Sequence, residues 1–213
     1  MPNNPPVSRR ASCAACNRPA SACICGWVVP VAHRVEVLIL QHPLEVAHAK
    51  NSARLLHLCL PHSRLVVGEA FDDKTWLTAP WNAGDAPRRP VLLYPATPLD
   101  QAVDLVPPPA LDAASLAEPA RLRLVVLDGT WRKSRKMLYA SPALQQLPRL
   151  ALRDIPPSRY LIRKARRPDQ LSTLEAVCAA LKQIEGDAVA VGPLLAAFDG
   201  FVGQQLSHRT LGR

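Results

Sequence analysis

Short, continuous apolar runs alternate along the chain with stretches whose apolar residues recur at helical spacing. The continuous runs occupy residues 35–40, 65–68, 91–94 and 122–127, with a last candidate at 150–152. Each is too short for a typical helix and ends at Pro, Gly or a polar turn. Such runs are typical of strands that are buried on both faces of a parallel sheet.

Helical spacing is clearest in residues 171–185, where the apolar positions form one stripe. Ser172 is followed three residues later by Glu175, which fits a capping box at the start of this helix. Strands that alternate with helices predict an α/β fold with a mostly parallel sheet and helices on both faces. Further helices are predicted at 47–60, 131–139 and 193–206, and the Pro- and Ala-rich residues 97–120 predict a loop or a poorly packed crossover.

The 213 residues, 48% of them hydrophobic, are enough for one main domain with a small appended module. We expect a disordered tail over residues 1–11, a cysteine-rich knuckle over 12–30 and the main domain over 31–213. No apolar run approaches the roughly 20 residues that cross a bilayer, and the first ten residues lack the apolar stretch of a signal peptide. We therefore expect a soluble, cytoplasmic protein with no membrane partner.

Positive charge is concentrated in one segment. Residues 131–169 contain 11 Lys or Arg and 2 Asp, which accounts for the whole formal net charge of +9. Such a block favours a polyanionic partner, and nucleic acid leads, although a solvated basic face is the simpler alternative. Five prolines interrupt the block, so it cannot form one long amphipathic helix on a membrane surface.

Four of the six cysteines fall within thirteen residues as Cys13-x2-Cys16-x6-Cys23-x-Cys25. In a reducing compartment this crowding favours thiolate ligation of a structural zinc ion over disulfides. Reduced structural thiols or oxidation-prone thiols are the alternative. The other two, Cys59 and Cys178, lie in apolar helical patterns and are expected to be small core residues.

Three predicted strands end in unusual turns, at residues 40–43, 94–96 and 128–131. Because ligands collect outside the carboxyl ends of strands in open α/β sheets, these turns define the predicted pocket. Neither a G-x-G-x-x-G fingerprint nor a P-loop is present in the sequence. The amino end of the helix at Ser172 offers another anion site, although a simple cap explains the same residues.

Simpler interpretations exist for the other candidate residues. Asp128 precedes a glycine and could be an ordinary turn residue, and Trp131 could belong to the core. His42 and His48 have no second ligand at metal-binding spacing, so structural roles are expected for both.

The segment Asp128-Gly129-Thr130-Trp131, followed by Arg135-Lys136-Met137 and Ser141-Pro142, resembles the D-x-T-W signature of the DTW-domain proteins, the tRNA-uridine aminocarboxypropyltransferases. The resemblance extends in order over about residues 13–207. Its supporting matches are residues 51–54, residues 94–96, the pattern Ser158-x-Tyr160-x-x-Arg163, the pair Thr173-x-Glu175 and the cysteine segment.

The resemblance implies a SPOUT-like domain with a deep trefoil knot, which binds S-adenosylmethionine mainly through backbone groups. Such enzymes transfer the 3-amino-3-carboxypropyl group to N3 of a tRNA uridine and release methylthioadenosine. The residues expected around the cofactor are Leu40, Tyr94, Pro95, Leu127, Gly129, Ser172, Thr173 and Glu175.

The expected catalytic residues are Asp128, Thr130 and Trp131. Asp128 would take or polarise the N3 proton, Thr130 would fix its carboxylate, and Trp131 would wall the cofactor or stack on the base. We expect a tRNA-binding monomer with no obligate protein partner, and Arg18 as an extension of its basic surface. That surface is predicted to contain Arg132, Lys133, Arg135, Lys136, Tyr160, Arg163, Lys164, Arg166 and Arg167.

Two alternatives stay open on the sequence. A SPOUT-like RNA methyltransferase would use the same cofactor and the same surface but would release S-adenosylhomocysteine. A zinc-containing RNA-binding module without catalysis would explain the basic block and the cysteines alone.

Overall fold

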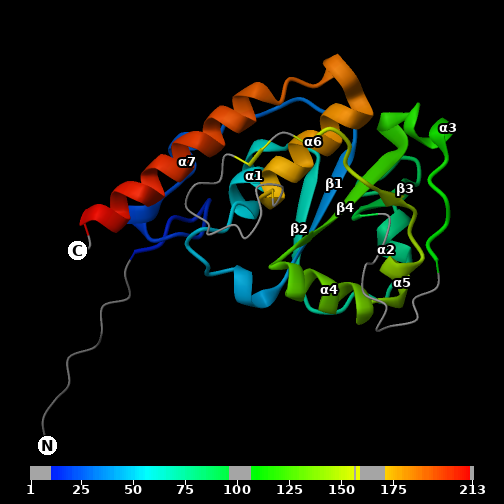
Figure 1. Ribbon diagram of the computed structural model, residues 1–213, viewed down its shortest axis with the longest axis horizontal. Coiled ribbons are helices and arrows are strands. Elements are labelled where there is room, and N and C mark those ends of the chain that lie inside the picture. The colour runs from blue at the N-terminus through cyan, green and yellow to red at the C-terminus, as the bar shows by residue number, and fades with distance from the viewer. Residues whose placement is uncertain (1–10, 96–106, 156, 159–170, 212–213) are drawn as a thin grey trace, which may run out of the picture.

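The computed structural model describes residues 11–95, 107–155, 157–158 and 171–211, which contain a five-stranded, fully parallel sheet (Figure 1). The strand order is β2-β1-β4-β3-β5. All residues of the two central strands are buried, as their continuous apolar character predicts. The strands are β1 (Glu36–Gln41), β2 (Ser63–Val67), β3 (Arg89–Leu93), β4 (Leu122–Asp128) and β5 (Arg149–Leu150).

Helices cover both faces of the sheet, so the predicted α/β architecture is confirmed (Figure 1). One core cluster joins alternate residues of β1 and β4 to α1 (Ala53–Cys59), α6 (Thr173–Glu185) and α7 (Gly192–Leu211). The intervening strand residues pack on the opposite face against α2 (Thr75–Thr78), α4 (Trp131–Tyr139) and α5 (Pro142–Gln145). Remaining helical segments are α3 (Ala113–Leu116), η1 (Ala20–Ala22), η2 (Cys25–Trp27), η3 (Pro43–Glu45), η4 (Pro119–Arg121) and η5 (Gly186–Ala188).

Several predicted boundaries were wrong. The helix predicted at 47–60 begins only at Ala53, because Pro43 starts a separate 3-10 turn and the Asn51 Oδ1 atom accepts the N–H of Ala53 at 2.9 Å. Residues 107–120 are more ordered than a loop, since Asp112 caps α3. By contrast, the predicted capping box of α6 is confirmed.

The amino end of β4 is tied down by a buried arginine. Arg123 is fully buried, and each of its five N–H groups has an acceptor. Two of them donate to Oε2 of Glu36 on β1, at 2.8 and 2.6 Å. The other three donate to backbone carbonyls at Trp76, Leu77 and Ala79, so one side chain joins the sheet to the α2 segment.

The cysteine segment packs on α7, far away in sequence. The Trp27 Nε1–H donates to the Gln204 side chain at 2.7 Å, and that side chain donates to the Cys23 carbonyl at 3.0 Å. The Trp27 ring lies so close to Gly200 that an added Cβ atom would be 2.4 Å from it, which explains a glycine within this helix. The predicted tail lies outside the described residues, apart from Ala11.

None of the helices in the described ranges combines the length and the apolar character needed to cross a bilayer.

Candidate active site

The carboxyl ends of β1 and β4 bring two polar side chains together. Gln41 is the last residue of β1 and Asp128 is the last residue of β4, and the two are register partners. Both are buried, with 3% of Asp128 exposed. A carboxylate at this position needs hydrogen-bond donors around it, because an unsolvated charge is costly to bury.

Those donors come from three separate elements. The Oδ2 atom of Asp128 accepts hydrogen bonds from Gln41 Nε2 at 2.9 Å and from Asn51 Nδ2 at 2.6 Å. The Oδ1 atom accepts one from the Thr173 hydroxyl at 2.7 Å, at the first turn of α6. Within the described ranges, no Lys or Arg forms an ion pair with this carboxylate. Neutral groups alone therefore hold the negative charge there.

One acceptor position is left over. An ionised carboxylate offers about four lone-pair positions, and the three bonds to Asp128 use two on Oδ2 and one on Oδ1. The second position on Oδ1 has no donor among the residues that the structure describes. The carboxylate can therefore accept one further hydrogen bond without losing one of these three.

Three residues after Asp128 in the chain, at the start of α4, two aromatic rings stack. Trp131 is 59% exposed, and its ring lies 5.3 Å from the buried Tyr94 ring at an angle of 16°. The Arg149 guanidinium lies 5.4 Å from the Tyr94 ring centre, and its Nε and Nη1 atoms have no hydrogen-bond partner among the described residues. Burial lowers the pKa of Arg149 and raises that of Tyr94.

At the amino end of α6, Ser172 and Glu175 are already engaged. The Ser172 hydroxyl accepts the Glu175 N–H, and Oε2 of Glu175 accepts the Ser172 N–H at 2.8 Å. The Ser158 hydroxyl donates to both oxygens of Glu175. Glu175 therefore acts as part of the helix cap. The residue of this turn that contacts Asp128 is Thr173.

The cysteine segment has the geometry of a four-thiolate metal site. The Sγ atoms of Cys13, Cys16, Cys23 and Cys25 all lie within 4.8 Å of one another. The Cys13–Cys25 and Cys16–Cys23 pairs are 3.6 and 3.8 Å apart. Four sulfurs at about 2.3 Å from zinc would be about 3.8 Å apart in a tetrahedron, so the residues fit this ion. Backbone N–H groups of Cys16 and Ala15 lower the pKa of Cys13 to about 6, whereas the hydrogen bond with Cys13 raises the pKa of Cys25 to about 12, so without an ion the cluster favours one thiolate.

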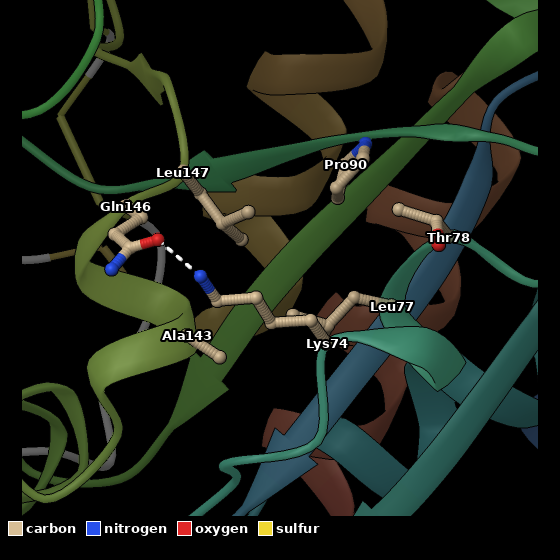
Figure 2. Close-up of a pocket in the computed structure, with 7 residues that line it drawn as sticks. All are labelled: Lys74, Leu77, Thr78, Pro90, Ala143, Gln146 and Leu147. Carbon is tan, nitrogen blue, oxygen red and sulfur yellow. Dashed lines mark hydrogen bonds between the residues drawn. The ribbon is translucent and has the colours of Figure 1, made fainter.

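A cavity of about 160 Å³ lies elsewhere, between α2, α5 and the start of β3 (Figure 2). Its lining is mostly apolar, and the Lys74 ammonium at its rim donates to the Gln146 side chain. Pro90 in its wall pairs in register with Arg123, at the amino half of β4. The cavity is therefore separate from the Asp128 site.

The family model for the DTW domain matches residues 10–206. The chain belongs to the DTW-domain family. This match covers the cysteine segment, the sheet and most of α7.

Three curated relatives of this DTW-domain protein carry the same name. The "tRNA-uridine aminocarboxypropyltransferase 2" of Drosophila melanogaster is 32% identical, over 84% of this chain and 69% of the relative. The proteins of the same name from Mus musculus and Macaca fascicularis are 27% and 26% identical, over 95% of this chain and 66% of each relative. This chain thus spans about two thirds of the length of these relatives. No solved structure matches it.

The predicted site residues in and around the family motif differ in burial and in hydrogen-bond partners. The Thr130 hydroxyl accepts the Lys133 N–H at 3.4 Å as the cap of α4, and the hydroxyl that donates to Asp128 is that of Thr173. Gly129 packs closely, since an added Cβ would lie 3.1 Å from Cβ of Lys133. The Leu40 and Leu127 side chains are buried in the core, so a ligand would reach them only through backbone. Pro95 is exposed beside Tyr94.

The structure describes four of the nine residues predicted for the basic surface. Arg132 and Arg135 are exposed. Lys133 pairs with Glu45 and Lys136 pairs with Glu69, each at 2.8 Å. These pairs reduce the positive charge beside the site. The other predicted members, Tyr160, Arg163, Lys164, Arg166 and Arg167, lie outside the described residues.

Sequence reasoning placed Gln41 in a predicted pocket turn, but it gave neither Gln41 nor Asn51 a role at the site. Both had a signal: Gln41 is a polar residue directly after an apolar strand, and Asn51 lies in a segment that matches the family. Their shared contact with Asp128 depends on the pairing of β1 with β4 and on the turn before α1.

Proposed function

We propose that this DTW-domain protein transfers the 3-amino-3-carboxypropyl group of S-adenosylmethionine to N3 of a uridine in tRNA. The names of its relatives support this activity, and the buried carboxylate of Asp128 supports a site for it. The single observation that carries the chemistry is the open acceptor position on Oδ1 of a carboxylate that neutral donors hold.

In the proposed reaction, the uridine N3–H donates to this open position of Asp128. The N3 atom forms a bond to the γ-carbon of the methionyl group, the bond from that carbon to sulfur breaks, and sulfur keeps the electron pair. Asp128 accepts or polarises the N3 proton, and methylthioadenosine leaves as a neutral thioether. Because the methyl carbon is bonded to the same sulfur, the orientation of the co-substrate decides the product.

Substrate binding in this proposal uses the loops at the carboxyl edge of the sheet. The Trp131 ring, exposed and stacked on Tyr94, offers a face for an unstacked base. S-adenosylmethionine would lie against the backbone after β1, β3 and β4 and the first turn of α6. The proposed contact residues remain Leu40, Tyr94, Pro95, Leu127, Gly129, Ser172, Thr173 and Glu175.

The basic segment would bind the tRNA backbone. Arg132 and Arg135 follow Trp131 on α4, and we propose that the basic residues of 159–170 contact the tRNA backbone as well. The protein would act as a cytoplasmic monomer.

Two further parts of the proposal concern architecture. Residues 12–30 would form a knuckle in which the four cysteines hold a structural zinc ion, beside a catalytic domain over 31–213. That domain would be SPOUT-like and knotted.

The activity is tested with tRNA lacking uridine modifications and with S-adenosylmethionine labelled either in the methyl group or in the methionyl carboxylate. We expect the carboxylate label in the tRNA, methylthioadenosine as co-product and a modified uridine in nucleoside mass analysis. Methyl label in the tRNA together with S-adenosylhomocysteine would assign a methyltransferase instead. If the protein binds tRNA but forms neither product, it is an RNA-binding module without this catalytic activity.

A further inference from the structure

The cysteine segment reaches the candidate active site through one arginine. Arg18 directly follows Asn17, whose φ of +57° turns the chain after Cys16. The turn is closed by hydrogen bonds from the Asn17 N–H to the Cys13 carbonyl and from the Cys13 N–H to the Arg18 carbonyl, both at 2.8 Å. The Arg18 backbone is therefore fixed by the same loop that presents Cys13 and Cys16.

The Arg18 side chain points into the protein instead of extending a basic surface. Its Nη1 atom donates to the Ala49 carbonyl at 2.7 Å, and its Nη2 atom donates to the Asn51 carbonyl at 2.8 Å. The guanidinium also lies 5.1 Å from the ring centre of Phe201, a fully buried residue of α7. The planar guanidinium donates to the two carbonyls from two separate nitrogens, a fork that the single nitrogen of a lysine cannot reproduce.

The carbonyls that Arg18 binds belong to the turn that carries Asn51. Residues 46–49 of this turn are exposed, so core packing does not hold them. The Asn51 side chain nevertheless makes the shortest of the three hydrogen bonds to Asp128, at 2.6 Å. Its Oδ1 atom accepts the Ala53 N–H, so the orientation of the amide is fixed at both ends.

We propose that Arg18 is a positioning residue for the transfer reaction: it fixes the Ala49–Asn51 turn so that the Asn51 amide holds the Asp128 carboxylate. The cysteine knuckle then serves catalysis as a rigid base for this arginine. The inference rests on the proposed function for the role of Asp128. The contact chain from Arg18 to Asp128 is independent of it.

The test compares full-length Arg18→Ala and Arg18→Lys with the native protein. Arg121→Ala serves as the matched control, because Arg121 is an exposed arginine at the other end of the sheet, paired with Glu118. Four quantities are measured: kcat, KM for tRNA and for S-adenosylmethionine, bound zinc, and the NMR signal of the Asn51 side-chain amide without substrates.

We expect Arg18→Ala to lower kcat about tenfold, as for partial loss of a hydrogen bond to a charged group, while both KM values stay within about twofold. The Asn51 amide signal should move upfield and zinc content should stay the same. Arg18→Lys, which keeps the charge but has one donor nitrogen in place of two, should fold and recover part of kcat and part of the signal shift. Arg121→Ala should match the native protein in all four quantities.

Two results would overturn the inference. A higher KM for tRNA with an unchanged kcat would make Arg18 an RNA contact. An unchanged Asn51 signal in both Arg18 variants would show that the turn holds its position without the arginine. If the native protein transfers nothing, the proposed function fails, and the Asn51 signal still decides whether Arg18 positions this amide.

Discussion

The two ends of β4 each bury a charged side chain, and the protein treats the two charges differently. Arg123 at the amino end pairs with Glu36, and all five of its N–H groups have acceptors. Among the described residues, Asp128 at the carboxyl end has only neutral donors, and one of its acceptor positions has no donor there. A saturated charge can only hold the fold together, whereas an unsaturated one can still bind a substrate.

Substitutions at the two ends of β4 should therefore affect different properties, stability at one end and activity at the other. Breaking a buried pair leaves an uncompensated charge, which destabilises a protein strongly. Replacing a carboxylate that neutral groups hold changes the local charge without leaving a partner cation unpaired. Changes at the amino end should therefore act on unfolding, and changes at the carboxyl end should act on turnover.

The largest effect on stability is expected for Arg123→Met. It leaves the Glu36 carboxylate with only Arg88 as a partner and frees three carbonyls, so the free energy of unfolding should fall by about 3–5 kcal/mol. Urea unfolding measures this loss. The double variant with Glu36→Met should lose less than the single one; an equal or greater loss would show that the pair is not what stabilises this end.

A carboxylate at position 51 should impair turnover instead. Asn51→Asp would place two carboxyl groups about 2.6 Å apart, and like charges raise the pKa of such a pair. We expect kcat to fall about tenfold to a hundredfold, and to fall further as rising pH removes the shared proton. The raised pKa also means that the variant loses stability as pH rises. Rate measurements between pH 5 and 8 test this, and a pH profile parallel to that of the native protein would argue against close contact.

A smaller effect is expected from the helix cap at the carboxyl edge. Ser172→Ala removes the hydroxyl that accepts the Glu175 N–H, so the free energy of unfolding should fall by about 1 kcal/mol. Thr173 begins the same helix, and a modest fall in kcat should accompany the loss. Ser172→Asp, which restores a capping acceptor, should recover the stability. If it does not, the serine has a role other than capping.

The smallest expected effect comes from His33, which should make the free energy of unfolding depend on pH. Burial, aided by His62, lowers the pKa of His33, whose Nε2 accepts the His62 N–H at 3.3 Å and must stay unprotonated to do so. Because the folded state disfavours the proton, stability is fully present above pH about 6.5 and falls as pH decreases below it. Urea unfolding at pH 7.5 and 5.5 should show this fall, and His33→Gln should reduce it. The exposed His48→Gln should leave the slope unchanged.

Much of the fold could be predicted from the sequence, because strands buried on both faces leave unbroken apolar runs. Asp128 could be placed at a strand end for the same reason. Its partners could not be predicted, since Asn51 and Thr173 are 77 and 45 residues away along the chain. Thr130 was the natural choice by proximity, yet the turn directs its hydroxyl to Lys133 N–H.

The direction of Arg18 shows a second limit of sequence reasoning. Composition assigns an arginine to a basic surface, but its two carbonyl acceptors are formed by a turn more than thirty residues away. Only the packing of the cysteine segment against α7 and the turn before α1 decides which way this side chain points.

The most direct test of the central claim is the single-turnover rate of aminocarboxypropyl transfer by Asp128→Asn. The asparagine oxygen can accept from Gln41 and Asn51, and its amide can donate to Thr173, so the fold should survive within about 1 kcal/mol. With tRNA and S-adenosylmethionine at saturation, we predict a rate lower by about a hundredfold to ten-thousandfold. A near-native rate with the same product would contradict the assignment of this carboxylate to the reaction.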